Sequence, residues 1–329
     1  MPGEFELIER YFRTGFPSRE DVVVGIGDDA AVLAPPPAGR QLVVAVDTLV
    51  EGVHFPPDFD AADLGYRALA VNLSDLAAMG AEPAWMTLAL TLPKADDAWL
   101  VAFARGLREA AAPWRVALVG GDTTRGPLTV TIQLLGTVPA GQAIRRSGAR
   151  AGDGIHVTGT PGDAAMGLLC LQRGIEGSAA EHCRRRFARP EPRLALGHAL
   201  RGLASAMIDI SDGLLADLDH LLDASGVGAT IQTPRVPRSD AFRDCLAALQ
   251  ESDRTRAAHF PLAGGDDYEL CFTVPPEHEA EVCCIAERLG VPVTRIGTIE
   301  MVQGLRVMDE DGRNMVVKTL GYDHFRENG

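Results

Sequence analysis

The stretch AMIDISDGLLADLDHLLDA (Ala206–Ala224) shows the pattern on which the whole chain is built. It opens with a short apolar run interrupted only by Asp209, which is typical of a buried strand. The turn Ser211-Asp212-Gly213 follows, and the leucines after it recur at helical spacing. The segment therefore predicts a strand over residues 206–210 and a helix over residues 213–224, with Asp209 and Asp212 on either side of Ser211.

The same alternation of strands and helices continues on both sides of this stretch. Strands are predicted over residues 22–25, 42–47, 84–92, 115–119, 128–138, 154–158 and 268–274, and helices over residues 61–79, 96–112, 162–172, 193–203 and 276–289. The segment Pro139-Ala-Gly141 interrupts the pattern. We therefore expect an α/β or α+β protein with two domains, residues 1–140 and 141–329, in agreement with the chain length.

Composition narrows the classes of function. The 329 residues carry 31 Lys and Arg against 45 Asp and Glu, a net charge of −14, which disfavours nucleic acid and anionic membranes as partners. The six cysteines are irregularly spaced without a C-x-x-C pair, and the first twelve residues are too acidic for a signal peptide. Apolar runs fall short of the roughly 18 residues that a membrane span needs. We therefore expect a cytoplasmic protein.

One motif suggests a dinucleotide site. Residues 25–30 fit G-x-G-x-x-A after a short strand, and Asp47 lies where such folds place a ribose-binding acid. However, Pro35-Pro36-Pro37 follows where a helix is required, and the Asp28-Asp29 pair would repel a pyrophosphate. A dehydrogenase is therefore a distant alternative. A Walker-type phosphate loop is excluded, because G-K-[ST] does not occur in the sequence.

Aspartates recur at the ends of the predicted apolar segments. They are Asp28 and Asp29, Asp47, Asp75 (within a helix), Asp122 after Gly120-Gly121, Asp209 and Asp212, and Asp266 and Asp267 after Gly264-Gly265. If the strand ends converge on one crevice, carboxylates so close need cations to remain ionised. Such all-oxygen ligands favour Mg²⁺ or Mn²⁺, with substrate phosphates completing the coordination. The acids therefore indicate metal-dependent phosphoryl transfer.

Several strings carry a resemblance to a known family. They are GIGDDAA (Gly25–Ala31), VDTLVEGVHF (Val46–Phe55), NLSDLAAMGAEP (Asn72–Pro83), GGDT (Gly120–Thr123), DISDGL (Asp209–Leu214), GGDDYEL (Gly264–Leu270) and GYDHF (Gly321–Phe325). In this order they closely resemble the thiamine-monophosphate kinase family of the aminoimidazole-ribonucleotide-synthetase-like superfamily. The resemblance implies that ATP and several Mg²⁺ ions are used to convert thiamine monophosphate to thiamine diphosphate. It also implies an N-terminal ATP- and Mg²⁺-binding domain that forms a homodimer through its sheet, followed by a C-terminal α/β domain.

The resemblance also implies roles for individual residues. The implied metal ligands are Asp29, Val46 (through its carbonyl), Asp47, Asp75, Asp122, Asp209 and Asp212, and the implied catalytic acids are Asp29, Asp47, Asp75, Asp122 and Asp212. ATP contacts are implied for Gly121, Asp122, Arg146 and Ser211, and substrate contacts for His54, Asp266 and Tyr322. The chain departs from the family at Ala45 and Val46, where Ser or Thr is common, at Asp266, where Glu is usual, and at Tyr322, where Trp is common.

Two other functions remain open at this point. A related ATP-dependent enzyme, such as aminoimidazole-ribonucleotide synthetase, would share the metal-binding acids but not GGDDYEL and the aromatic motif near the C-terminus. A non-catalytic nucleotide-binding or maturation scaffold would not need to crowd carboxylates. For the kinase, the acceptor phosphate is largely ionised near neutral pH, so direct in-line transfer requires alignment and charge neutralisation rather than a general base.

Overall fold

The structure is a computed structural model of the chain, and it describes residues 4–315, 317 and 321–322. The chain divides into two compact units. Unit 1 comprises residues 1–76 and 81–141, and unit 2 comprises residues 77–80 and 142–329. Each unit contains one large sheet with helices packed on it, so the fold is of the α+β class. In the described part of the chain, no helix is long and apolar enough to cross a membrane.

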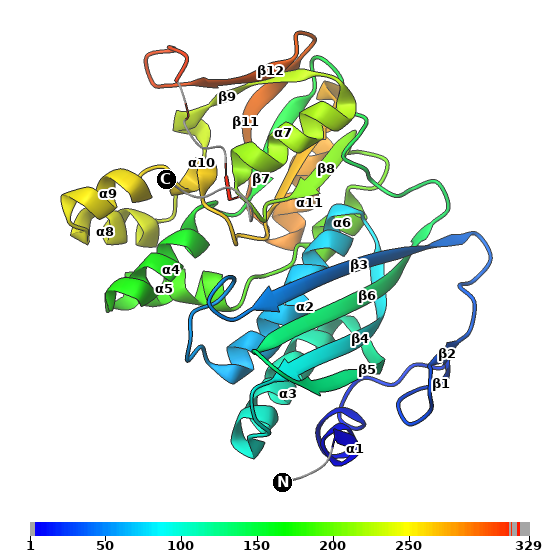
Figure 1. Cartoon of the computed structure of the whole chain (residues 1–329). Helices are drawn as coiled ribbons and strands as arrows, with labels where there is room; N and C mark the ends of the chain where they lie inside the picture. The colour runs from blue at the N-terminus through cyan, green and yellow to red at the C-terminus, as the bar shows by residue number, and fades with distance from the viewer. Residues whose placement is uncertain (1–3, 316, 318–320, 323–329) are drawn as a thin grey trace. The chain divides into compact units, whose positions relative to one another are not determined.

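Unit 1 is built on a four-stranded sheet in the order β3-β6-β4-β5 (Figure 1). Its strands are β3 (Arg40–Val50), β4 (Glu82–Leu92), β5 (Ala117–Arg125) and β6 (Thr129–Pro139). Strand β6 pairs antiparallel with β3 and β4, whereas β4 pairs parallel with β5. The segment before the sheet contains α1 (Glu4–Leu7), the π-helical turn η1 (Ile8–Phe12), and a two-stranded ribbon of β1 (Val22–Val24) and β2 (Val32–Leu33).

Helices cover only one face of this sheet. They are α2 (Ala61–Ala78) and α3 (Asp97–Ala111), the latter followed by the 3₁₀ turn η2 (Ala112–Trp114) (Figure 1). The two helices approach closely because α3 carries Gly106 at the contact. A Cβ atom there would lie 1.7 Å from the carbonyl oxygen of Ala62, so no larger residue fits. The other face, which we call the open face, carries neither of these helices. The β1–β2 ribbon covers part of it, where Val22 and Leu33 pack with Leu135 of β6.

Unit 2 is built on a six-stranded sheet in the order β12-β9-β11-β7-β10-β8. Its strands are β7 (Gly154–Thr158), β8 (Ala206–Asp209), β9 (Gly228–Gln232), β10 (Leu270–Val274), β11 (Val293–Glu300) and β12 (Gly304–Met308). Its helices are α4 (Asp163–Arg173), α5 (Ser178–Ala188), α6 (Leu194–Ala199), α7 (Leu214–Ser225), α8 (Asp240–Ala248), α9 (Glu251–Ala257), α10 (Phe260–Ala263) and α11 (Glu279–Leu289), with 3₁₀ turns η3 (Thr233–Arg235) and η4 (Pro276–His278). All neighbouring strands are antiparallel except β9 and β12.

Two apolar clusters hold the elements of unit 2 together. The leucines of α7, such as Leu214 and Leu218, pack with Ile155 and Ile208 of the sheet, and all four side chains are at most 2% exposed. A second cluster joins α4, α5 and α8, in part through Phe242. The first cluster fixes α7 on the sheet and so determines where the turn between β8 and α7 lies.

The structure corrects several expectations about individual elements. Strand β3 continues past Asp47 to Val50, and β5 extends past Asp122 to Arg125, so both acids lie inside strands rather than at strand ends. Asp47 pairs with Ile132 of β6, and Asp122 pairs with Ala89 of β4. Pairing with a long neighbouring strand thus outweighs the low strand propensity of Asp. The polar stretch after residue 172 contains helix α5, and the helix predicted to end at residue 203 ends at Ala199.

Candidate active site

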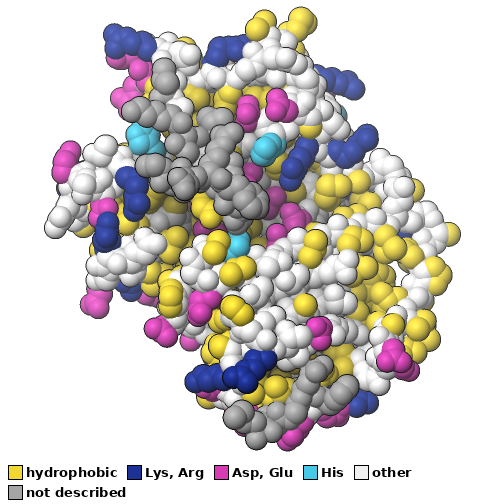
Figure 2. Space-filling view, viewed as in Figure 1, with side chains coloured by type: hydrophobic (Ala, Val, Ile, Leu, Met, Phe, Trp, Pro, Cys, Tyr) yellow, Lys and Arg dark blue, Asp and Glu magenta, His cyan; other side chains and the backbone are white. Residues whose placement is uncertain are grey.

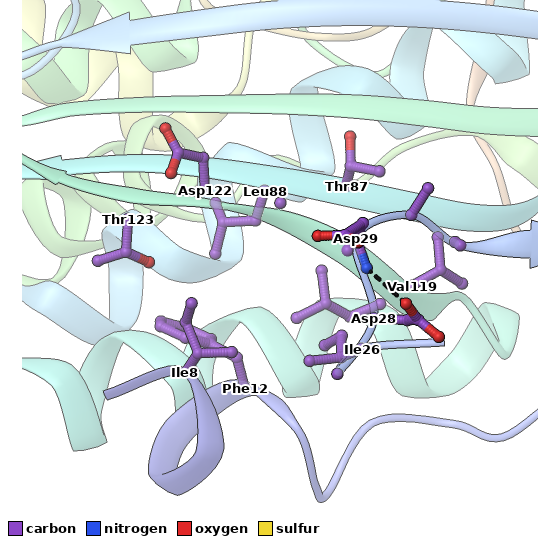
Figure 3. Close-up of a pocket in the computed structure, with 16 residues that line it drawn as sticks. Ile8, Phe12, Ile26, Asp28, Asp29, Thr87, Leu88, Val119, Asp122 and Thr123 are labelled. Atoms are coloured by element: carbon purple, nitrogen blue, oxygen red, sulfur yellow. Dashed lines mark hydrogen bonds between the residues drawn. The ribbon is translucent and has the colours of Figure 1, made fainter. Parts of the chain in front are cut away.

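Unit 1 has a pocket of about 730 Å³ beside the edge strand β5 (Figure 3). This volume is within the range of small-ligand sites. The lining residues are Ile8 and Phe12 of η1, residues 26–31 of the loop between β1 and β2, Thr87 and Leu88 of β4, and residues 118–123 of β5. In Figure 3, Ile8 and Phe12 lie on one side, and the carboxylate of Asp122 points to the other. The pocket therefore combines an apolar side with an acidic one.

Gly121 gives this pocket part of its shape. Its φ of 153° lies in a region that favours glycine, and a Cβ atom would lie 1.9 Å from the carbonyl oxygen of Leu88. The close approach of β5 to β4 therefore requires a glycine at this position. The predicted ATP-contacting residues Gly121 and Asp122 both line the pocket.

Three carboxylates line the pocket, those of Asp28, Asp29 and Asp122, and all three residues are exposed. Asp28 Oδ1 accepts a hydrogen bond of 2.9 Å from the backbone N–H of Asp29. Within the described residues, the carboxylates of Asp29 and Asp122 accept no hydrogen bond and form no ion pair. Their oxygen atoms are therefore available to bind a cation, as expected for metal ligands.

Asp47 lies apart from Asp122 within unit 1. Strands β3 and β5 are the two edges of the sheet, so β6 and β4 separate the two acids by about 14 Å at roughly 4.8 Å per strand. Successive residues of β3 alternate between faces, and Asp47 shares the more buried face with Leu49, whereas Val46 is 60% exposed on the open face. Strands β3 and β5 run in the same direction, and Asp47 lies nearly level with Asp122 along them. The expectation that the strand ends converge is nevertheless wrong for this pair, because the two strands are opposite edges of the sheet. Asp75 is half-buried on α2.

His54 follows β3 in a tight turn. The ring Nδ1 of His54 accepts a hydrogen bond of 3.0 Å from the backbone N–H of Val50. The backbone N–H of His54 donates to the Val50 carbonyl. The neutral ring must therefore carry its proton on Nε2. This tautomer leaves His54 with a single ring N–H as its hydrogen-bond donor.

Unit 2 brings three loops together. We call residues 209–213, 264–269 and 321–322 the three-loop junction. Backbone hydrogen bonds join the loops, from Asp266 N–H to the Ser211 carbonyl (2.8 Å), from Tyr268 N–H to the Ile210 carbonyl (2.8 Å), and from Tyr322 N–H to the Asp212 carbonyl (2.9 Å). The structure thus brings together the predicted residues Asp209, Ser211, Asp212, Asp266 and Tyr322. The last three residues of GYDHF, 323–325, lie outside the described residues.

The GGDDYEL segment alternates between strained and buried residues. Asp266 and Tyr268 have φ angles of 72° and 51°, a left-handed conformation that non-glycine residues rarely adopt. Asp267, which lies between these two residues, is 2% exposed, and Glu269, which follows Tyr268, is 0% exposed. Strain of this kind persists only where the surroundings enforce it, and it is frequent at binding sites. The hydrogen bonds of the two buried acids and those from the N–H groups of Asp266 and Tyr268 hold the segment in this conformation.

Asp267 and Glu269 are held by different partners. Asp267 accepts hydrogen bonds from the backbone N–H groups of Gly162 (2.7 Å) and Ala164 (3.1 Å) at the start of α4, and burial raises the pKa of its carboxyl well above the ordinary value. Burial also acts to raise the pKa of Glu269, but hydrogen bonds and charges from Arg193 and Arg186 outweigh it, so that pKa lies below its usual range. Arg193 donates to both Glu269 oxygens at 2.7 and 2.6 Å. Both acids are structural anchors.

Asp217 is a third buried acid of the junction. Its Oδ2 accepts hydrogen bonds from three successive backbone N–H groups, those of residues 211–213. Burial and, to a smaller extent, the nearby charges of Asp209 and Asp212 raise the pKa of this carboxyl to about 7, against the opposite effect of its hydrogen bonds. Asp217 therefore supports the turn that follows Asp209 and carries Asp212, two of the predicted metal ligands.

Comparisons with known proteins identify the family. Models of the AIR synthase related protein match residues 27–138 (N-terminal domain) and 150–310 (C-terminal domain). The thiamine-monophosphate kinase of Salmonella typhimurium is 50% identical over 327 residues, covering 98% of each chain. The crystal structure of thiamine-monophosphate kinase from Stenotrophomonas maltophilia K279a is 48% identical, with a TM-score of 0.83, covering 90% of this chain and 93% of that one. The AaThiL structure, complexed with AMPPCP and TMP, is 31% identical, with a TM-score of 0.76, covering 91% and 92%.

The chain belongs to the thiamine-monophosphate kinase family. This confirms the family and the fold that the sequence motifs indicate. As in the sequence-based assignment, the two AIR synthase related domains follow one another along nearly the whole chain.

Two predicted ATP contacts of this kinase-family chain, Arg146 and Ser211, belong to unit 2. Arg146 accepts a hydrogen bond through its backbone carbonyl from Ser225 Oγ, at the C-terminal end of α7. Ser211 and Asp212 precede the N-terminal end of the same helix, whose 12 residues span about 18 Å. Within unit 2 the structure therefore does not bring the backbone of Arg146 next to Ser211.

The donor atoms of this kinase-family chain suit Mg²⁺ in one specific way. Among the described residues, no three His, Cys, Asp or Glu side chains are close enough to form a metal site by themselves. Mg²⁺, however, is usually held by one or two carboxylates, with waters and substrate phosphates completing its shell. The exposed oxygens of Asp29 and Asp122 fit that requirement, whereas an all-protein cage does not.

Reasoning from the sequence missed several residues of these sites. Ile8 and Phe12 line the pocket but precede every recognised motif, and Thr87 lies in an apolar strand. Asp217 could have been found, because an acid in the first turn of a helix is a common partner of the free N–H groups there. Tyr268 had no such signal, because its unusual φ arises from the loop as a whole.

Proposed function

We propose that the chain transfers the γ-phosphoryl group of ATP directly to the phosphate of thiamine monophosphate and so forms thiamine diphosphate. The observation that carries this proposal is the unit 1 pocket, where the exposed carboxylates of Asp29 and Asp122 lie beside Gly121 and have no hydrogen-bond or ion-pair partner among the residues that the structure describes. The names of the relatives support the same reaction. We further propose that residues 1–140 act as the ATP- and Mg²⁺-binding domain.

The protein's main task in this reaction is to align the acceptor phosphate with the γ-phosphoryl group of ATP. The transition state of phosphoryl transfer is loose, and the acceptor phosphate is already ionised, so no side chain has to remove a proton. When bound, Mg²⁺ would neutralise charge between the two anionic phosphates. We assign one Mg²⁺ ion to Asp29 and Asp122 at the pocket. We assign further Mg²⁺ ions to the remaining ligands, which are Asp47, Asp75, Asp209, Asp212 and the Val46 carbonyl. Gly121, Ser211 and Arg146 are assigned to ATP.

The substrate end is assigned to three residues. His54 offers its Nε2–H as a donor, as its hydrogen bond with Val50 dictates. Tyr322 is 41% exposed, and Asp266 lies on the loop joined to the same turn. An aromatic face and a carboxylate suit the cationic thiazolium ring of thiamine. Asp266, where Glu is usual, is still a carboxylate but has a shorter side chain. Tyr322, where Trp is common, is still aromatic but offers a smaller area for stacking.

The open face of the unit 1 sheet supports a homodimer. Leu42, Val44 and Val46 project from the edge strand β3 and are 52%, 52% and 60% exposed. Figure 2 shows hydrophobic side chains on this face, which lies toward the viewer. An apolar row on an edge strand is typical of a surface that another chain covers. We therefore propose that two copies associate through β3.

The dimer is tested with matched charge insertions. Val44→Arg should shift the protein toward monomer in sedimentation velocity, because it places a charge in the apolar row. Val101→Arg is the control, since Val101 is 55% exposed on α3, away from the sheet face. Equal sedimentation of both variants and the unvaried dimer would argue against this interface.

The reaction is tested by incubating the purified full chain with ATP, Mg²⁺ and thiamine monophosphate and measuring thiamine diphosphate. Absence of product from folded protein would defeat the proposal and favour a nucleotide-binding scaffold. Activity with aminoimidazole-ribonucleotide precursors instead would indicate the related synthetase. Trapping a phosphorylated enzyme during turnover would contradict direct transfer. The cytoplasmic location stays a prediction from the sequence.

A further inference from the structure

The turn that carries Ser211 and Asp212 is held from beneath by one buried carboxylate. Asp217 is 3% exposed, and its Oδ2 accepts hydrogen bonds from the N–H groups of Ser211 (3.0 Å), Asp212 (3.1 Å) and Gly213 (3.1 Å). Three successive N–H groups that point at one site form an anion-binding concavity. In this chain, the concavity is filled by the protein's own carboxylate.

This arrangement is more than ordinary helix capping. Helix α7 starts at Leu214, and Gly213 before it has no side chain to cap it. Asp217 in the first turn accepts hydrogen bonds from residues 211–213, which precede the helix, rather than from the N–H groups of the helix's own first turn. An exposed Ser or Asp at the cap position would cap the helix without burying a charge. Here the carboxylate is buried and also lies within the electrostatic reach of Asp209 and Asp212. Burying a carboxylate near two other acids costs free energy of folding, and such a cost is expected where the geometry of the turn matters.

The hydrogen bonds of Asp217 decide which groups of the turn can reach a ligand. Because the N–H groups of Ser211 and Asp212 already donate to Asp217, this turn cannot bind a phosphate through its backbone, as a glycine-rich phosphate loop does. The carbonyls of the same two residues accept hydrogen bonds from Asp266 and Tyr322. The backbone of the turn is thus fully engaged, and its side chains are what it can offer to a ligand.

We propose that Asp217 is a positioning residue for the cation and ATP contacts of unit 2. It fixes the turn so that Asp212 presents its carboxylate to the metal together with Asp209, which strand β8 holds in place, and Ser211 presents its hydroxyl to ATP. Asp217 itself contacts neither ligand. The inference rests on the proposed function for the roles of these three residues, while the role of Asp217 rests on its hydrogen bonds.

The first test measures metal binding directly. Mn²⁺, a substitute for Mg²⁺ at oxygen ligands, is titrated into the full chain and followed by electron paramagnetic resonance. Asp217→Ala should weaken Mn²⁺ binding by about tenfold or more, as the loss of a group that orients metal ligands does. Asp217→Asn should stay within about threefold, because its amide oxygen can accept the same three hydrogen bonds. Asp223→Ala, an exposed site on the same helix, is the matched control.

The outcomes separate positioning from mere stability. If Asp217→Ala and Asp223→Ala bind Mn²⁺ equally well, the proposal is overturned. In kinetic assays, Asp217→Ala should raise the KM for ATP at limiting Mg²⁺ more than it lowers kcat at saturating Mg²⁺. A purely structural role would instead lower the amount of active protein without moving KM, and that result would also overturn it.

A second measurement does not depend on whether Asp217→Ala folds. In the unvaried chain, the amides of residues 211–213 should exchange slowly with deuterium, and Asp217→Asn should preserve that protection. Rapid exchange of these amides in the unvaried chain would overturn the proposal. If the unvaried chain makes no thiamine diphosphate, the proposed function fails, while the Mn²⁺ and exchange data still decide the role of Asp217.

Discussion

Two Asp-Asp pairs that look alike in the sequence occupy opposite environments in this molecule. In unit 1, Asp28 and Asp29 are exposed beside the pocket, and the Asp29 carboxylate accepts no hydrogen bond from the described residues. In unit 2, Asp267 is 2% exposed and accepts two backbone hydrogen bonds at the start of α4, while its neighbour Asp266 is held at a φ of 72°. The first pair is exposed at a pocket, whereas in the second pair Asp267 anchors the loop that carries Asp266.

This difference indicates that some acids of the chain serve ligand binding and others serve the stability of the fold. An exposed carboxylate without partners adds little to the free energy of unfolding, so its removal should affect ligands rather than the fold. A buried carboxylate that satisfies backbone N–H groups or arginines holds its surroundings in place, and its removal leaves those groups unpaired. Substitutions in the two regions should therefore separate activity from stability.

The largest effect is expected at the pocket. Asp122→Asn should lower kcat about 10³-fold, equivalent to about 4 kcal/mol of activation free energy, because it removes the charge of a proposed metal ligand. The free energy of unfolding should change by less than about 0.5 kcal/mol, since the residue is exposed. Steady-state assays and urea unfolding measure the two quantities. Glu20→Gln, at another exposed acid of unit 1, is the control, and activity of Asp122→Asn within tenfold of the unvaried chain would refute the assignment.

The next effect is expected on stability and falls in the buried region. Glu269→Gln should lower the free energy of unfolding by about 3 kcal/mol, because Arg186 and Arg193 would lose their buried counter-charge. Urea unfolding followed by circular dichroism measures it. Asp311→Asn breaks an exposed pair with Arg313 in the same unit and should cost less than about 1 kcal/mol. Equal losses in the two variants would show that the Glu269 network is not the anchor described above.

The local elements were largely predictable, because buried periodic segments keep their signal in the sequence. Strand β7 has the predicted bounds, α2 ends one residue before its predicted end, and α7 is shifted by one residue at both ends. Helix α5 was missed because its apolar positions, such as Cys183 and Phe187, are surrounded by arginines. The extent of β3 and β5 depends on the strands beside them, which a local pattern does not contain.

The site was predictable in its residue types but not in its arrangement. The sequence around each Asp-Asp pair does not distinguish Asp29 from Asp267, because the N–H groups that donate to Asp267 belong to residues more than 100 positions away. The strand order also places Asp47 and Asp122 on opposite edges of the unit 1 sheet, although each follows an apolar run in the sequence. Burial and pairing of single acids are tertiary properties.

A pH-dependent effect distinguishes the buried acid by its sign. The pKa of Asp267 is raised from its ordinary value of 3.8, chiefly by burial, so folding favours the protonated carboxyl. The unvaried chain should therefore lose stability relative to Asp267→Asn as the pH rises above 3.8 toward the higher pKa of the folded state. Each unit of pKa shift corresponds to about 1.4 kcal/mol. Urea unfolding of both proteins at several pH values checks this, and a relative stability that is constant or rises with pH would contradict it.

The smallest effect is expected at Asp28, and it distinguishes the two members of the exposed pair, Asp28 and Asp29. Asp28 supports Asp29 through the hydrogen bond from the Asp29 N–H to Asp28 Oδ1, which the amide oxygen of Asp28→Asn can also accept. We therefore expect only about a threefold loss of activity, from the weaker negative potential at the pocket. Asp29→Asn, assayed in parallel, should lose about 10²-fold or more as a proposed metal ligand. If the two variants lose activity equally, Asp28 is itself a ligand, and the pocket holds its cation with both members of the pair rather than with Asp29 and Asp122.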